Sequence, residues 1–516
     1  MTAHMEEHRL RTAPLSMDAD EFKTLGHELV DQIAELLASV PSRPVTPPAL
    51  SPQAIRDAFG LENALPERGM PADALLTETA RQLFECSLFN AHPRFFGYIT
   101  APPAPIGILG DFLASALNAN VGMWTLAPAA TEIEGQTIRW LAELIGFPAG
   151  DGLLVSGGNA ANINCFIAAR AAVADWDVRR EGVGAGRGRQ LVAYASKEAH
   201  TWIQKAADIC GLGTDAIRWI ETNAHLQMDT AALRRAIDAD AAAGRLPFLV
   251  AGTAGSVSTG VVDRLDDISA VCREKAIWFH VDGAYGGFAA ALPDAAPALR
   301  ALREANSIAV DPHKWLYSPL EAGCALVRDA DALTRAFAYH PPYYHMDQRV
   351  VNYVEHGSQN SRGFRALKVW LSLKQVGAAA FRQMIADDMR LARALADFVD
   401  EHPELELVTQ ALSITTFRYV PADLSGTQGD APVDHYLNEL NQKLLDELQR
   451  GGEIFVSNAV VGGRYALRAC IVNFHTTAGD VEAVPHIVAR QGRTLDARLR
   501  PATLRRQSDE RRATSD

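Results

Sequence analysis

The chain has 516 residues, of which 48% are hydrophobic and 22% are charged, a balance typical of a soluble enzyme. This length exceeds what one hydrophobic core supports, so we expect two or three domains. The formal net charge of -13 argues against a nucleic-acid-binding protein, which needs a basic surface to neutralise phosphates.

The six cysteines are scattered and form no C-x-x-C pair, which favours reduced thiols over a disulfide framework or a zinc site. We therefore predict no metal site. Residues 1–13 carry acidic and basic side chains but no apolar run, so they do not look like a signal peptide. The longest charge-free stretch, residues 112–131, contains Asn, Gly and Pro and would make a poor transmembrane helix. The sequence predicts a soluble, cytoplasmic protein that does not bind membranes.

Residues 20–40 predict an amphipathic helix, because apolar side chains recur there every three or four positions. These positions are Phe22, Leu25, Leu29, Ile33, Leu36, Leu37 and Val40. A proline-rich connector, residues 41–48, ends the helix. A helix followed by a stiff linker cannot bury its apolar face alone, so we expect it to pack on another subunit or on the main domain.

Between residues 150 and 330, short apolar runs alternate with helical segments. The strand-like runs are residues 153–155, 191–194, 248–250, 277–281, 308–310 and 325–327, and helices are expected at 162–173, 230–242 and 265–275. This alternation predicts an α/β fold with a mostly parallel sheet covered by helices on both faces. Ligands bind such sheets at the carboxyl ends of the strands.

Beyond residue 375, a long helix at 381–402 and a strand at 413–419 indicate a small C-terminal α+β domain. The tail after Arg490 is rich in arginine and nearly free of large apolar residues, so we expect a solvated, disordered end. We divide the chain into an N-terminal helical segment (1–104), a large α/β domain (105–375), a small α+β domain (376–490) and a disordered tail (491–516).

Lys314, in Asp311-Pro312-His313-Lys314-Trp315-Leu316, directly follows the strand-like run 308–310. A lysine is an unusual residue at the carboxyl edge of a sheet, because burying its ammonium without a partner is costly. This placement indicates an amine that does covalent chemistry. The obvious candidate is a Schiff base with an aldehyde cofactor.

Three other features fall at strand ends of the same sheet. The turn at 156–161 opens a helix whose free N–H groups could hold an anion, although a tight structural turn explains it equally well. Asp282 closes a strand before a glycine, and is either a turn cap or a carboxylate facing a protonated pyridine nitrogen. His200 alone could be structural or exposed, but here it could stack on a planar ring and contact a substrate carboxylate. The ordered set of glycine turn, His, Asp and Lys is hard to assign to chance.

These segments resemble the pyridoxal-5′-phosphate (PLP)-dependent group II amino acid decarboxylases, the family of the aromatic-L-amino-acid, tyrosine, histidine and glutamate decarboxylases. The resemblance is carried by residues 92–98, 127–132, 199–200, 280–285 and 311–315, and extends from about residue 20 to about residue 480. It implies a fold type I PLP enzyme and an obligate homodimer with active sites at the subunit interface. Residues 1–104 would then be a dimerisation segment that wraps over the partner.

The motif match assigns a role to each candidate residue. Lys314 would form the Schiff base with PLP, Asp282 would pair with the pyridinium nitrogen, and His200 would stack on the ring. The residues near the phosphate would be Gly158, Asn159, Ser256 and His313. Asn159 and Ser256 replace or vary residues that are Ser or Thr in many relatives.

The segment 339–345 has the composition of a loop. In the resembling decarboxylases a mobile loop here carries a tyrosine that protonates the substrate carbon, and Tyr343 aligns best with it. Tyr344 is the alternative donor, and a loop aromatic that packs on a lid is a non-catalytic alternative. Relatives that make aldehydes tend to carry phenylalanine at this position, so Tyr343 favours simple decarboxylation.

The segment 117–124 bears on the substrate, because in aromatic-amino-acid enzymes it supplies bulky apolar side chains to the partner's pocket. Here Asn120 and Gly122 stand at those positions, and the Asn-x-Asn pattern also resembles glutamate-type decarboxylases. Tyr98 and Trp124 could still line an aromatic pocket. We expect decarboxylation of an aromatic L-amino acid (tyrosine, DOPA, tryptophan or phenylalanine) to the amine and CO2. The alternatives are an acidic or other small amino acid (glutamate, aspartate, cysteine sulfinate or 2,4-diaminobutyrate) and a decarboxylation-dependent aldehyde synthase.

Three other classes of protein explain the sequence less well. A nicotinamide oxidoreductase would use residues 156–161 as its nucleotide turn, but the glycine spacing is absent and Lys314 stays unexplained. An aminotransferase on the same fold usually lacks the His-Lys-Trp segment. A non-catalytic interaction protein would usually have lost one of the four residues Lys314, Asp282, His200 and Tyr343.

Overall fold

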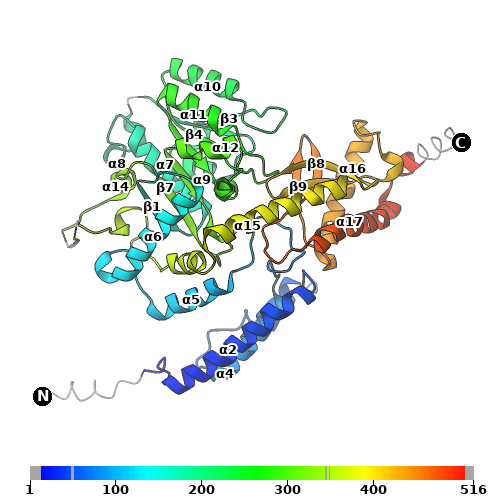
Figure 1. The fold of residues 1–516 in the computed structure, drawn as a ribbon, viewed down its shortest axis with the longest axis horizontal. Coiled ribbons are helices and arrows are strands. Elements are labelled where there is room, and N and C mark those ends of the chain that lie inside the picture. The colour runs from blue at the N-terminus through cyan, green and yellow to red at the C-terminus, as the bar shows by residue number, and fades with distance from the viewer. Residues whose placement is uncertain (1–12, 48–50, 187, 343–345, 348, 506–516) are drawn as a thin grey trace.

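The computed structural model describes residues 13–47, 51–186, 188–342, 346–347 and 349–505. These residues form a large mixed sheet flanked by helices, a small antiparallel sheet and an N-terminal helical segment (Figure 1). No helix in the described ranges is long and apolar enough to cross a membrane.

The large sheet has seven strands in the order β1-β7-β6-β5-β4-β2-β3. Their bounds are β1 (Asp151–Val155), β2 (Leu191–Ser196), β3 (Ile217–Ile220), β4 (Leu246–Thr253), β5 (Trp278–Asp282), β6 (Ser307–Val310) and β7 (Gly323–Val327). Strand β7 is antiparallel to its neighbours β1 and β6, and all other neighbouring strands are parallel. Every strand except β7 therefore runs in one direction, and their carboxyl ends meet at one edge.

Helices cover both faces of this sheet, as its sequence predicts. Strands β5, β6 and β7 are buried at every position, which requires cover on both sides. The helices of this part are α5 (Pro105–Leu117), α6 (Pro128–Ile145), α7 (Gly158–Val173), α8 (Val178–Glu181), α9 (Trp202–Ile209), α10 (Thr230–Ala242), α11 (Leu265–Lys275), α12 (Pro297–Arg300), α13 (Pro312–Trp315) and α14 (Ala332–Phe337). Helix α7 contacts β1, β4, β5, β6 and β7, so it spans the middle of the sheet.

The small sheet has the order β10-β11-β9-β8 and is antiparallel throughout. Its strands are β8 (Leu405–Ala411), β9 (Ile414–Tyr419), β10 (Ser457–Val461) and β11 (Arg464–Cys470), covered by α16 (Ala431–Gly451) and α17 (Ala478–Leu499). The long helix α15 (Ala366–Asp400) runs from the large sheet to the small one (Figure 1). Gly377 interrupts it with φ 72° and ψ 168°, a conformation that glycine adopts without steric cost. The expected helix at 381–402 is the part of α15 beyond this break.

The structure corrects the expected disorder of the tail for residues 491–505, because α17 continues to Leu499 and residues 502–505 are helical. Leu495 and Leu504 are buried in the small hydrophobic core, and the Arg500 guanidinium pairs with the carboxylates of Asp423 and Asp496. This part of the chain is ordered because its leucines reach a core and the arginine between them has two partners. Residues 506–516 lie outside the described residues.

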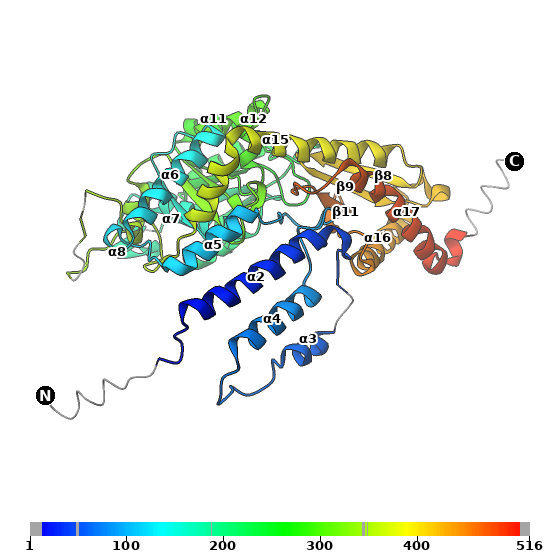
Figure 2. The same ribbon diagram turned by 60° about the horizontal axis from the view of Figure 1, so that its bottom comes forward.

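The N-terminal helices are α2 (Ala19–Ser39), α3 (Pro52–Phe59) and α4 (Ala72–Cys86). Asp18 caps α2 by accepting hydrogen bonds from the N–H groups of Asp20 and Glu21. Helices α2 and α4 contact each other and extend away from both sheets in the two views (Figures 1 and 2). Within α2 only Leu25 is buried, and Phe22 is 56% exposed. The apolar face predicted for this helix is therefore only partly covered in the single chain. Leu25 and Val40 are buried, four of its positions are partly buried, and Phe22 is exposed.

The segment that follows α4 is hydrogen-bonded into the C-terminal part of the chain. The Phe96 N–H donates to the Phe455 carbonyl at 2.7 Å, and the Cys470 N–H donates to the Phe96 carbonyl at 2.9 Å. The Phe96 side chain is fully buried in the core of the small sheet. Residues near the start of the chain thus complete the small sheet's core.

Candidate active site

A cavity of about 610 Å³ opens at the carboxyl edge of the large sheet. Its volume lies within the range of small-molecule sites. Six predicted site residues line it: Gly158, Asn159, His200, Asp282, His313 and Lys314. They meet there because each follows, or ends, a strand that runs toward this edge.

Lys314 lies in the short helix α13, directly after β6. Its Nζ is 3.2 Å from Asp311 Oδ2, and Asp311 is only 1% exposed. This ion pair offsets the cost of bringing the ammonium into the cavity wall. The second carboxylate oxygen, Asp311 Oδ1, has no hydrogen-bond partner among the described residues. Sequence reasoning gave Asp311 no role, although an acid three residues before the lysine was a usable signal.

The glycine turn after β1 packs against the lysine segment. Helix α7 begins at Gly158, and its N-cap Gly157 provides no side-chain acceptor, so the first N–H groups of the helix remain available to an anion. A Cβ atom on Gly158 would lie 2.7 Å from Asp311 Oδ2 and 2.9 Å from Ala284 Cβ. Only glycine fits there, because the start of α7 packs closely against Asp311 and Ala284.

His313 and Ser256 were both predicted to lie near the phosphate. The His313 Nδ1 is 2.7 Å from the Ala322 carbonyl, and its Nε2 is 3.6 Å from Asp311 Oδ2. Burial lowers the pKa of His313 below its ordinary value. The Ser256 hydroxyl is buried and lies 2.8 Å from the Thr259 hydroxyl, while the cavity is lined by the neighbours Gly255 and Val257.

Asp282 and His200 lie near each other and near Lys314. Asp282 ends β5, is 8% exposed, and accepts a hydrogen bond from the Ala284 N–H at 3.2 Å. Burial lowers the pKa of His200, and the charges of Asp282 and Lys314 shift it in opposite directions. The His200 Nδ1 accepts a hydrogen bond from the Trp202 N–H at 3.2 Å, so a neutral ring carries its proton on Nε2.

Tyr343 and Tyr344, the predicted proton donors, lie outside the described residues. Of the residues predicted to shape the substrate pocket, Tyr98 is 59% exposed and precedes Ile99, which lines the cavity. Asn120 Oδ1 accepts hydrogen bonds from the N–H groups of Gly122 and Arg362. A Cβ atom on Gly122 would lie 2.3 Å from the Asn360 carbonyl oxygen. Asn120 and Gly122 are therefore explained by contacts within their own chain.

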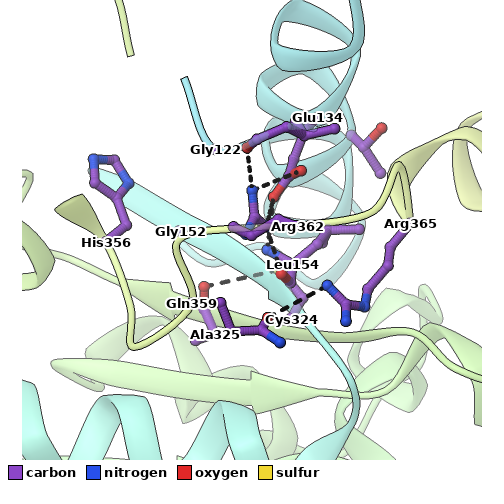
Figure 3. A network of polar contacts seen from close by, with 12 residues as sticks. Gly122, Glu134, Gly152, Leu154, Cys324, Ala325, His356, Gln359, Arg362 and Arg365 are labelled. Atoms are coloured by element: carbon purple, nitrogen blue, oxygen red, sulfur yellow. Dashed lines mark hydrogen bonds and ion pairs between the residues drawn. The ribbon is translucent and has the colours of Figure 1, made fainter. Parts of the chain in front are cut away.

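A buried ion pair between Glu134 and Arg362 fixes the strand that leads into the glycine turn (Figure 3). The Arg362 guanidinium donates to the Leu154 carbonyl at 2.7 Å and to the Val121 carbonyl at 2.9 Å, and the Leu154 N–H donates to Glu134 Oε1 at 3.1 Å. Both side chains are almost fully buried. The network joins β1 to residues 120–122. Sequence reasoning missed it because its members are far apart in the chain.

These groups fit PLP in charge and in chemistry. The cavity offers an amine that can hold an aldehyde, a helix N-terminus of the kind that binds phosphate, and a buried carboxylate of the kind that pairs with a pyridinium nitrogen. The glycine at the start of α7 lets this helix approach Asp311 and Ala284 more closely than any side chain would allow.

Comparison with known proteins identifies the family. Residues 52–420 match the family described as "Pyridoxal-dependent decarboxylase conserved domain". An aromatic-L-amino-acid decarboxylase from Bacillus atrophaeus is 33% identical over 90% of this chain and 94% of its own length. A phenylacetaldehyde synthase from a Rosa hybrid cultivar is 28% identical over 88% and 91% of the two chains.

The fold agrees with this match. The crystal structure of Oryza sativa TDC with PLP and tryptamine superposes with a TM-score of 0.85, at 28% identity, over 94% of this chain and 100% of that one. That structure contains PLP, the cofactor for which the groups around Lys314 are suited. The chain therefore belongs to the family of pyridoxal-dependent decarboxylases and is a PLP-dependent carboxy-lyase.

Proposed function

We propose that this enzyme decarboxylates an aromatic L-amino acid (tyrosine, DOPA, tryptophan or phenylalanine) to the corresponding amine and CO2. The observation that carries the proposal is the convergence of Lys314, Asp282 and His200 with the glycine turn on one cavity, in a chain of this family. Support for an aromatic substrate comes from the name of the Bacillus relative and from the tryptamine in the Oryza sativa structure.

PLP, when bound, supplies an electron sink for the electron pair that the Cα–carboxylate bond leaves behind. In the proposed arrangement Lys314 Nζ attaches the cofactor covalently. The Asp282 carboxylate keeps a proton on the ring nitrogen by Coulomb attraction in a partly desolvated site. His200 stacks on the ring, and the proton on its Nε2 is available to the substrate carboxylate.

The phosphate is proposed to bind at the start of α7, where the N–H groups after Gly157 are not capped by a side chain. Gly158 and Asn159 provide this backbone and His313 lies beside it, packed against Gly157. The Ser256 hydroxyl is hydrogen-bonded to the Thr259 hydroxyl. Ser256 is proposed to lie near the phosphate because its neighbours Gly255 and Val257 line the cavity.

Tyr343 is proposed to deliver the proton that replaces CO2 on the substrate Cα, with Tyr344 as the alternative donor. A tyrosine at this position favours the amine over the aldehyde product. An aldehyde synthase is the second candidate function, because the Rosa relative has that name. The hydrogen bonds of Asn120 within its own chain explain its polar side chain without an acidic or other small substrate.

We propose a homodimer in which the N-terminal segment, residues 1–104, packs on a second copy of the chain. Large apolar side chains are exposed on α2, α4 and α5, and several of them line an apolar hollow of about 300 Å³ between these helices. Examples are Phe22, Val30, Leu76, Leu109 and Phe112. An uncovered apolar surface of this kind marks an interface.

A cytoplasmic location is also part of the proposal, supported by the six cysteines, which are free thiols.

The experiment that tests this function measures CO2 release from each of the twenty amino acids by the purified, PLP-loaded protein, with amine and aldehyde products quantified. We expect release from at least one aromatic amino acid, with the amine as the main product. Lys314→Ala should abolish release and the borohydride-trappable link to the cofactor. Lys275→Ala, at the surface ion pair with Asp238, is the matched control and should retain both. Release from acidic or small amino acids alone would refute the aromatic assignment, and a trapped link in Lys314→Ala would refute the assigned lysine.

A further inference from the structure

The two aromatic residues that follow Lys314 most closely share one hydrogen-bond acceptor. Trp315 Nε1 donates to Asp388 Oδ2 at 2.9 Å, and the Tyr317 hydroxyl donates to the same oxygen at 2.7 Å. Asp388 lies on α15, beyond the break at Gly377, and is 2% exposed. A single carboxylate on the long helix thus holds the chain on the C-terminal side of the lysine.

Burying the Asp388 carboxylate at this position costs free energy. In the described part of the chain no lysine, arginine or histidine forms an ion pair with it, so its charge is balanced only by hydrogen bonds. These come from Trp315, Tyr317 and the Asn473 N–H. Burial raises the pKa of Asp388 to about 7, although these hydrogen bonds lower it. A buried carboxylate without a cation costs stability compared with a well-packed apolar residue. Its presence is therefore poorly explained by stability alone.

The other contacts of Trp315 and Tyr317 connect the Asp388 carboxylate to the cavity wall and to the turn after Lys314. The Trp315 ring stacks on Tyr285, with centroids 4.9 Å apart, and Tyr285 comes three residues after Asp282. Tyr317 has φ 53°, a left-handed conformation that is unfavourable for a bulky side chain. The Tyr317 carbonyl accepts a hydrogen bond from the Ala104 N–H at 2.7 Å. The turn after Lys314 is thus strained, and the bonds to Asp388 contribute to holding it in this form.

We propose that Asp388 is a positioning residue, which fixes the direction in which Lys314 enters the cavity by anchoring Trp315 and Tyr317. The inference rests on the proposed function, in which Lys314 carries the cofactor. It also links the lysine to α15, the helix that connects the two sheets (Figure 1). Asp388 touches neither the cavity nor the reacting atoms, and acts only through its two partners.

The test separates positioning from simple structural support. The triple variant Trp315→Phe/Tyr317→Phe/Asp388→Leu removes both side-chain donors and their acceptor together and keeps an aromatic ring at positions 315 and 317. Removing donors together with their acceptor costs less stability than leaving buried donors unpaired, as the single variant Asp388→Leu does. We therefore expect the urea unfolding midpoint of the triple variant to fall less than that of Asp388→Leu.

For the same variant we expect the rate of borohydride trapping of the cofactor link to fall about 10-fold or more, because a small misplacement of a reacting group can cost as much as 100-fold. The kcat should fall in parallel, while KM changes less than about 3-fold, since no substrate contact is removed. Asp388→Asn keeps an acceptor oxygen and should retain most of the trapping rate. Tyr194→Phe, which deletes a similar buried bond from a tyrosine hydroxyl to Asp240, is the matched control and should leave both rates unchanged.

Peptide mass analysis of the trapped protein makes the outcomes distinguishable. A link on Lys314, with trapping rate and kcat in the triple variant within about 2-fold of the wild type, overturns the role of Asp388 alone. A link on another lysine overturns the proposed function as well. If the triple variant does not fold, the single Trp315→Phe and Tyr317→Phe variants decide the question. Each must lower the trapping rate more than Tyr194→Phe does, and equal rates reject the proposal.

Discussion

Asp282 has a local task in the fold and, in the proposed mechanism, a chemical task for the same carboxylate. One oxygen accepts the Ala284 N–H and shapes the turn after β5, while the residue also lines the cavity. An amide would preserve the first task, because it still offers an acceptor oxygen. It would remove the negative charge that the proposed mechanism needs at the ring nitrogen.

We predict that Asp282→Asn retains bound PLP but lowers kcat on the order of 100- to 1000-fold, the usual effect of removing one preorganised electrostatic partner. Cofactor content is measured from the visible absorbance after dialysis, and kcat from CO2 release. Asp238→Asn, at a surface ion pair with Lys275, is the control and should match the wild type. Loss of cofactor in proportion to the loss of kcat would argue that Asp282 only maintains the pocket.

Tyr343→Phe removes the proposed proton donor and keeps the aromatic ring. We expect less amine and more aldehyde with ammonia, measured by chromatography of the products from the best substrate. Tyr344→Phe is made in parallel, because it tests the alternative donor. A product shift in Tyr344→Phe alone would transfer the role to Tyr344.

The sequence was sufficient to predict six of the residues that line the cavity. Lys314, Asp282, His200 and Gly158 each follow or end a strand, and parallel strands bring such positions to one edge. Asp388, by contrast, binds residues more than seventy positions earlier, and Glu134 and Arg362 are separated by more than two hundred. Pairings at such distances depend on how the helices pack, which no local pattern encodes.

At the level of elements, His280 joins β5 to its neighbours inside the core. Its Nδ1 is 2.8 Å from the Ser307 hydroxyl on β6, and its Nε2 is 2.7 Å from Asn162 Oδ1 on α7. Complete burial lowers the pKa of His280 to about 4. An unfolded histidine titrates near pH 6.5, so between these two pH values the unfolded chain binds a proton that the folded chain does not. Acidification in this window therefore destabilises the fold.

We predict that the free energy of unfolding falls between pH 7 and pH 4 by on the order of 3 kcal/mol through His280 alone. His280→Gln removes this contribution, so the variant should lose less stability over the same window. Urea unfolding at pH 7 and at pH 4.5 measures the difference. His435→Gln changes a histidine that is 78% exposed on α16 and should follow the wild-type curve. An unchanged slope in His280→Gln would contradict the prediction.

Six strands of the large sheet were predicted from apolar runs, and the structure confirms them. The strand β3 was missed because Ile217–Ile220 is a short edge strand that alternates with Arg218 and a partly exposed Trp219. The antiparallel direction of β7 was not predicted, since the hydrophobic pattern of a strand does not indicate its direction in the sheet. The helical end of α17 was missed for another reason: charged residues around Leu495 and Leu499 mask the apolar spacing of the two leucines that contact the core.

For the whole molecule, the apolar surfaces of α2, α4 and α5 make the proposed dimer testable. Phe112 on α5 is 51% exposed and lines the apolar hollow. We predict that Phe112→Asp weakens association, so that light scattering after size exclusion finds more monomer, and that activity per chain falls with the dimer fraction. Val460→Asp changes an equally exposed apolar residue on β10 and should leave the mass unchanged. A monomeric wild-type protein with full activity would refute the dimer.

The hydrogen bonds of Phe96 determine when the small core can fold during synthesis of this protein. During translation the ribosome releases residue 96 long before Phe455 and Cys470, its two backbone partners. Because domains form as their parts emerge, the small core must wait for nearly the whole chain, and the aromatic ring of Phe96 stays uncovered until then. A chain truncated before β11 would therefore lose its C-terminal residues and would also leave the Phe96 carbonyl without its hydrogen-bond partner.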